Sequence, residues 1–257
     1  PIYEGEDSIL AWILDGPDSD YTVPLPGPGE EKRAILETYT KEHSAEYQSQ
    51  ALIDMAFRMR KHISDFSQIK NILIETSHHT HNVIGTGAKD PQKMDPNASR
   101  ETLDHSIMFI FAVALLDGRW HHVDSYDRGK VQNPETISLW HKISTIEKPY
   151  WTDLYHAKDP NKKAFGGKVI ITMNDGKIIE DKIERANAHP AGERPFKREN
   201  YIGKFDILTK ELITKKERNR FIELVENLRN LSAEQVKEIN VQVAELSNST
   251  LDTKGIF

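Results

Sequence analysis

The stretch that decides the fold is KVIITMNDGKIIEDKIE, residues 168–184. Apolar β-forming residues lie on both sides of an Asn-Asp-Gly turn, and these turn residues tolerate a positive φ angle. The pattern therefore predicts a β-hairpin. Upstream, the run KNILIET at residues 70–76 follows a polar turn and is a second short candidate strand.

Helical patterns surround these strands. Three segments combine helical spacing with start or stop signals: residues 44–63 with Ser44 as the N-cap, residues 100–116 ended by Asp117–Gly118, and residues 134–143. From Tyr201 onward the chain becomes charged and amphipathic, which predicts about three helices that end near Ser247. The chain therefore mixes strands and helices before an all-helical end.

The domain organisation follows from a loop rich in proline and glycine at residues 15–31, which marks a crossing between two structural units. We predict an α+β fold in three parts. Residues 1–21 end a helical domain and cross over, residues 22–192 form a mixed α/β domain, and residues 193–257 return to the helical domain. The amphipathic tail needs an apolar partner, and the opening run SILAWIL is too small to supply it. We expect the missing N-terminal part of the helical domain to do so.

Composition excludes several classes of function. With 34 basic and 40 acidic residues the net charge is −6, so we expect no nucleic-acid or membrane partner. Because cysteine is absent, this chain holds no disulfide, thiolate-bound cluster or cysteine nucleophile. No apolar run approaches the length of a membrane span, and the composition fits a cytoplasmic protein.

The densest polar cluster is SHHTHNVIGTGAKDPQKMDPNASRETLDHS, residues 77–106. If the histidines extend the preceding strand, His79 and His81 share one face. Two such imidazoles can ligate a metal, but no acidic residue or cysteine stands at the usual spacing to complete a site. Three readings stay open: an anion or substrate site, ordinary hydrogen-bonded histidines, and a metal site.

Further candidates lie around this cluster. His105 shares a helix face with Phe109, and Arg100 lies in the first turn of that helix, where a guanidinium and free N–H groups can receive a carboxylate. Lys41 precedes a helix start, where a cation is mildly unfavourable for the helix. Structural roles remain the alternative for each. No phosphate loop, dinucleotide fingerprint or nucleophile elbow is present.

The residues also carry a resemblance. The strings YTKEHSAEYQSQ, SHHTHNVIGTGAKDPQKMDPNASRETLDHS, LWHKISTIEKPYW and AHPAGERPFKRENYIGKF resemble bacterial 2-methylcitrate dehydratases, from about Tyr39 to near the end of the chain. The wider superfamily includes cis-aconitate decarboxylase. The resemblance implies a large helical domain built from both chain ends around an inserted α/β domain. It also implies that much of the site chemistry comes from a helical segment absent here.

Residue by residue, Lys41 matches a lysine that lines the family's active site. Relatives with a decarboxylase-type motif have a histidine five positions later, where this chain has Glu46. Phe109 stands where the family has a cleft-facing tyrosine, so a hydroxyl donor is lost. His105 and Arg100 lie beside it in the matched motif. The resemblance thus implies catalytic roles for Lys41 and His105, and substrate binding by His79, His81, Arg100 and Phe109.

The implied reaction is the dehydration of 2-methylcitrate to 2-methylaconitate in propionate catabolism, by a cytoplasmic homodimer. It needs a base for a C–H proton, an acid for the leaving hydroxyl, and donors for three carboxylates. No metal or redox cofactor is required. The alternatives are another polycarboxylate lyase or epimerase of the superfamily, a non-catalytic binding module, and a histidine-based metal protein.

Overall fold

The structure is a computed structural model that describes residues 26–31 and 38–243. The chain divides into two units, residues 1–39 and 40–257, and the elements below belong to the second. The opening run SILAWIL lies outside the described residues, as does Ser247, and the predicted loop at residues 15–31 is described only from residue 26.

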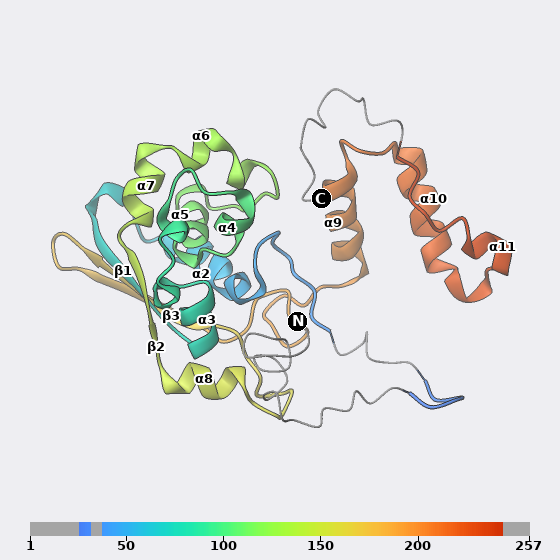
Figure 1. The fold of residues 1–257 in the computed structure, drawn as a ribbon, viewed down its shortest axis with the longest axis horizontal. Helices are drawn as coiled ribbons and strands as arrows, with labels where there is room; N and C mark the ends of the chain where they lie inside the picture. Colours follow the sequence, from blue (N-terminus) through green and yellow to red (C-terminus); the bar gives the residue numbers. More distant parts are fainter. Residues whose placement is uncertain (1–25, 32–37, 244–257) are drawn as a thin grey trace, which may run out of the picture. The chain divides into compact units, whose positions relative to one another are not determined.

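A four-stranded mixed sheet forms the centre of the second unit, in the order β2-β1-β3-β4 (Figure 1). The strands are β1 (Ile69–Thr76), β2 (Ile143–Glu147), β3 (Gly167–Met173) and β4 (Ile178–Ile183). Strands β1 and β2 are parallel, whereas β1–β3 and β3–β4 are antiparallel. The predicted α+β class is confirmed.

The predicted hairpin is strands β3 and β4. Gly176 has a φ of +87°, a left-handed conformation that side-chain-bearing residues rarely adopt, and Asp175 accepts a hydrogen bond from the Lys177 N–H at 2.8 Å. Strand β3 alternates buried and half-buried residues, and it places Val169, Ile171 and Met173 in the core. The turn chemistry and the alternation therefore agree on one register.

Helices pack against the buried face of the sheet, whose strands alternate buried residues with half-buried or exposed ones, and further helices follow toward the C-terminal end. They are α2 (Gln50–Arg60), α3 (His78–Val83), α4 (Arg100–Asp104), α5 (Ile107–Asp117), α6 (Arg128–Val131), α7 (Pro134–Trp140), α8 (Pro149–Tyr155), α9 (Arg198–Thr209), α10 (Lys215–Glu226) and α11 (Ala233–Val236). The last three correspond to the three predicted C-terminal helices.

Three predicted helix boundaries are wrong, and local capping explains two of them. The helix expected from Ser44 begins at Gln50, because Glu46 instead caps a short 3-10 helix at Tyr47–Ser49. The helix expected over residues 100–116 breaks before Ser106, whose hydroxyl oxygen accepts from the Phe109 N–H and starts α5 anew. The helix from Pro134 ends at Trp140, because β2 begins at Ile143.

The histidine run is a helix and does not extend the strand. The Ser77 side chain accepts a hydrogen bond from the Thr80 N–H at 3.2 Å, which ends β1 and begins α3 at His78. Residues two apart on a helix lie roughly 200° around its axis, so His79 and His81 face different directions. Their predicted shared face is therefore wrong.

Helix α5 forms the centre of the core. Every residue from Ile107 to Leu115 is buried, and the helix packs against α2 and α7. The Phe109 ring is fully buried and lies against Trp140, with ring centroids 5.2 Å apart, and against Tyr126 at 6.0 Å. A helix that is apolar all round must be enclosed on all sides.

The segments that lead into and out of the α/β core are tied to each other by polar contacts. The contacts are Thr40 to Tyr201 at 3.3 Å, the Lys41 carbonyl to Lys204, Glu42 to Arg194 at 2.6 Å, and Asp54 to the Asn187 N–H at 2.8 Å. The chain therefore enters and leaves this core at one place. Among the described residues, no helix combines the length and apolar character needed to cross a bilayer.

The burial of Phe109 generates the first prediction. Phe109→Ala should lower the free energy of unfolding by about 3–5 kcal/mol, because it leaves a cavity between Trp140 and Tyr126. Urea unfolding followed by tryptophan fluorescence measures this loss. Ile178→Ala, at a side chain 60% exposed on β4, is the matched control and should cost far less. A small loss at Phe109 would contradict its role in the core.

Candidate functional site

The site is built on the irregular segment between Lys41 and Gln50. The Gln50 side chain holds this segment in place, because its oxygen accepts from the His43 N–H at 2.8 Å and its nitrogen donates to the His43 and Ala45 carbonyls. Gln50 is itself buried at the start of α2. One amide side chain thus replaces the backbone hydrogen bonds that a strand or helix would provide.

Glu46 is the central titratable group of this segment. It is half-buried, and its carboxylate accepts a hydrogen bond from the Gln48 N–H at 2.6 Å. Burial raises the pKa of Glu46, while that hydrogen bond and the charges of Lys41 and His105 partly offset the rise. A carboxylate with a raised pKa is a stronger base than a free glutamate and exchanges protons closer to neutral pH.

A chain of polar side chains extends from Glu46. In the amide orientation that matches donors to acceptors, Gln48 donates to Glu46 and accepts from the Tyr155 hydroxyl and from Nε2 of His79 at 3.2 Å. The rings of His79 and Tyr155 stack with their centroids 5.1 Å apart. Burial lowers the pKa of His79, so its neutral imidazole is favoured. Burial raises the pKa of Tyr155, which keeps its hydroxyl protonated.

His105 completes this group from the end of α4. Its Nδ1 donates to the Glu101 carbonyl at 3.1 Å, and the side chain is 51% exposed. With Nδ1 used in this way, Nε2 carries the lone pair of the neutral ring. Lys41 is exposed and lies within electrostatic range of Glu46. Three of the predicted site residues are thus linked to Glu46: His79 through the Gln48 amide, and Lys41 and His105 through electrostatic interaction.

The other three predicted residues have different surroundings. His81 bonds to the Thr145 hydroxyl at 2.6 Å. Arg100 donates to the His122 carbonyl at 3.2 Å, and its guanidinium stacks 4.6 Å from the Tyr126 ring centre. Phe109 lies in the core. The structure therefore does not bring these three side chains to Glu46.

Sequence reasoning missed Gln48 and Tyr155. Gln48 lies in the quoted string YTKEHSAEYQSQ, but nothing in that string marks its amide as the link between Glu46 and His79. Tyr155 is 107 residues from Gln48 and ends α8, so only the folded chain brings the two together. No local pattern signals such a pair.

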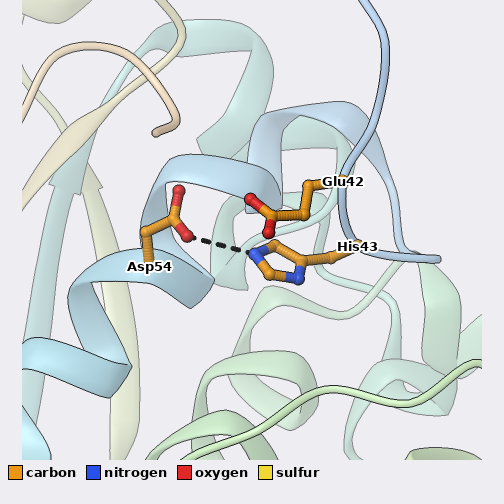
Figure 2. A group of neighbouring side chains, drawn as sticks. All are labelled: Glu42, His43 and Asp54. Carbon is orange, nitrogen blue, oxygen red and sulfur yellow. Dashed lines mark hydrogen bonds and ion pairs between the residues drawn. The ribbon is translucent and has the colours of Figure 1, made fainter. Parts of the chain in front are cut away.

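Figure 2 shows a second polar group, Glu42, His43 and Asp54, whose potential ligand atoms lie within 4.8 Å of one another. Nε2 of His43 lies 3.1 Å from a carboxylate oxygen of Asp54, and both side chains are buried. The other Asp54 oxygen accepts the Asn187 N–H, and Glu42 accepts two bonds from Arg194. A metal ion would have to displace these partners, so the group fits a structural tie better than a metal centre.

The comparisons with known proteins identify the family to which the chain belongs. The profile of the MmgE/PrpD C-terminal domain matches residues 43–230, and the chain belongs to this family. It is similar to a probable 2-methylcitrate dehydratase of Saccharomyces cerevisiae, with 29% identity over 162 residues, 62% of this chain and 29% of the relative. A 2-methylcitrate dehydratase of Cupriavidus necator is 32% identical over 89 residues, 35% of this chain and 18% of the relative. The chain thus spans less than a third of either relative.

The raised pKa of Glu46 generates the second prediction. Because burial disfavours its charged form, Glu46→Gln should stabilise the chain at pH 7. The advantage should shrink as the pH falls through the raised pKa and disappear below the ordinary value of 4.5, where folded and unfolded wild-type chains are both protonated. Urea unfolding at pH 7 and about pH 4 measures this difference. The control is Glu211→Gln at an exposed position. An advantage that grows at the lower pH would refute the assignment.

Proposed function

We propose that this chain supplies the α/β part of the active site of a hydro-lyase that dehydrates 2-methylcitrate to 2-methylaconitate in propionate catabolism. The single observation that carries the proposal is Glu46, half-buried with a raised pKa and within electrostatic range of Lys41 and His105. Membership of the MmgE/PrpD family and the printed names of the two relatives support the same reaction class. The reaction needs a group that exchanges protons, and the raised pKa brings Glu46 closer to neutral pH than an ordinary glutamate.

In the proposed mechanism, Glu46 takes the proton from the carbon beside a substrate carboxylate. Lys41 gives a proton to the hydroxyl on the neighbouring carbon, which leaves as water while the carbon–carbon double bond forms. The ammonium of Lys41 also offsets the negative charge that builds up when the C–H bond breaks. His105, which is also within electrostatic range of Glu46, is a second polar group for the substrate or for proton transfer.

His79, Gln48 and Tyr155 have a supporting role in this proposal. Neutral His79 and the protonated Tyr155 hydroxyl both donate to the Gln48 oxygen, which leaves the Gln48 nitrogen to donate to Glu46. The pair fixes the direction of the Gln48 amide, and the amide in turn fixes the Glu46 carboxylate. Such a support shell holds a proton-transfer group within the narrow geometry that catalysis requires.

The complete site requires more than these residues. We propose that the apolar face of α9 and α10, with exposed Tyr201, Ile207 and Val225, packs against further helices of a full-length protein. We also propose a homodimer in the cytoplasm, in line with the resemblance. Three substrate carboxylates need more donors than Lys41 and His105 supply, and the additional helices would provide them.

The third prediction concerns turnover. In a protein of the relatives' full length that carries this sequence, Lys41→Ala and Glu46→Gln should each reduce the rate of 2-methylcitrate dehydration by about 100-fold or more. Each variant removes one partner of the proton-transfer pair. Turnover is followed by mass spectrometry of the product, which separates loss of water from loss of carbon dioxide.

Lys177→Ala, at the exposed tip of the β3–β4 hairpin, is the matched control and should retain full activity. Near-wild-type turnover of Lys41→Ala would remove Lys41 from the mechanism. Loss of carbon dioxide instead of water would replace the proposed reaction with a decarboxylation on the same scaffold.

A further inference from the structure

A pocket of about 530 Å³ lies beside the candidate site. Its walls come from four places in the chain: residues 42–44, Phe57 of α2, the turn at residues 118–122 after α5, and residues 194–208, which include α9. Phe57, Trp120 and Phe196 supply aromatic surface. This volume lies in the range of sites that enclose a small organic molecule, which is about 300–1,000 Å³.

Lys204 projects from α9 into this pocket. It is half-buried, and its ammonium donates to the carbonyl of Lys41. Burial lowers the pKa of Lys204, and the positive charge of Lys41 lowers it further. Among residues 26–31 and 38–243, neither lysine has a carboxylate within ion-pair distance of its ammonium. The fold therefore holds two like charges within electrostatic range of each other, and neither ammonium forms an ion pair among the described residues.

The acidic residue that attracts Lys204 already forms an ion pair with an arginine. Glu42 attracts Lys204 electrostatically, but both of its oxygens bind the Arg194 guanidinium, at 2.6 and 2.8 Å. The cations Arg119, Arg194 and Lys204 outnumber the acids Glu42 and Glu199 on the pocket wall, and Lys41 adjoins it. The pocket thus carries an excess of positive charge between aromatic walls, where charges are less screened than in water.

We propose that this pocket binds a small organic polycarboxylate, with one carboxylate held between the ammonium groups of Lys41 and Lys204. This inference rests on the proposed function and deepens it, because it assigns Lys204 of α9 as a further substrate-binding residue. A carboxylate placed there removes the repulsion between the two lysines and replaces the water lost by Lys204 with a charge-assisted hydrogen bond. The aromatic walls exclude bulk water from the carbon skeleton of the ligand. Inorganic anions have no apolar carbon surface that could contact these walls.

The fourth prediction uses citrate as the probe, with the full 257-residue chain and titration calorimetry. Citrate should bind, and Lys204→Gln should weaken its affinity by about tenfold, the loss expected when one charge-assisted bond is removed. Lys204→Arg keeps the charge and should retain most of the affinity. Lys210→Gln, an exposed lysine at the end of the same helix, should match the wild type. Sulfate should bind more weakly than citrate.

A second measurement does not depend on any variant. In the wild-type chain, the pKa of the Lys204 ammonium, followed by NMR of the lysine side chains, should rise when citrate is added. The rise is expected because an anion favours the charged amine against both burial and Lys41. This readout decides the question even if Lys204→Gln does not fold.

The outcomes separate this proposal from the proposed function. Unchanged citrate affinity in folded Lys204→Gln, no citrate binding at millimolar concentration, or an unmoved Lys204 pKa would each overturn the pocket assignment. If citrate binding depends on Lys204 but the full-length protein does not dehydrate 2-methylcitrate, the pocket stands and the reaction is wrong. If dehydration occurs while Lys204 is irrelevant to binding, the reaction stands and the pocket is wrong.

Discussion

The rest of the structure depends on the complete burial of α5. A helix without a polar face cannot lie on the surface, so the chain must surround it with α2, α7 and the sheet. This requirement explains why the crossover from β1 to β2 is so long and contains several helices. It also explains why polar groups lie on the segments that enclose the core, where Ser44 accepts bonds from Trp120 and Tyr126.

The candidate site is a product of that enclosure. The segment before the 3-10 helix Tyr47–Ser49 has no regular structure, and the Gln50 side chain satisfies its backbone groups in place of a helix or strand. An irregular segment fixed in this way can direct side chains to both sides. On this segment, Glu46 faces the His79–Tyr155 pair. Glu42 instead faces Arg194, and His43 faces Asp54 of α2. Loops held on a rigid scaffold commonly carry function for this reason.

Local chemistry determined how much of the fold could be predicted from the sequence. The hairpin was predictable because its turn residues lie between two runs of β-forming residues. The strand at residues 69–76 was predictable because a run of β-forming residues follows a polar turn. The helix at His78 was missed because the Ser77 cap competes with strand periodicity and only the folded backbone shows which one prevails. Within the site, Lys41, His79 and His105 were found from composition and resemblance. Tyr155 and Lys204 were not, because each meets its partner across more than 100 residues of sequence.

The tie between the entering and leaving segments bears on how such a chain can evolve. The contacts between residues 40–54 and residues 187–204 bring both ends of the α/β core together, so any further domain joined to these ends would meet the core at one place. Genetic insertion of such a unit between two neighbouring helices disturbs the host little. The same geometry allows loops at the far edge of the sheet to lengthen or shorten without moving that junction. Under the proposed domain organisation, changes in the α/β core can therefore accumulate without altering a helical domain joined at this junction.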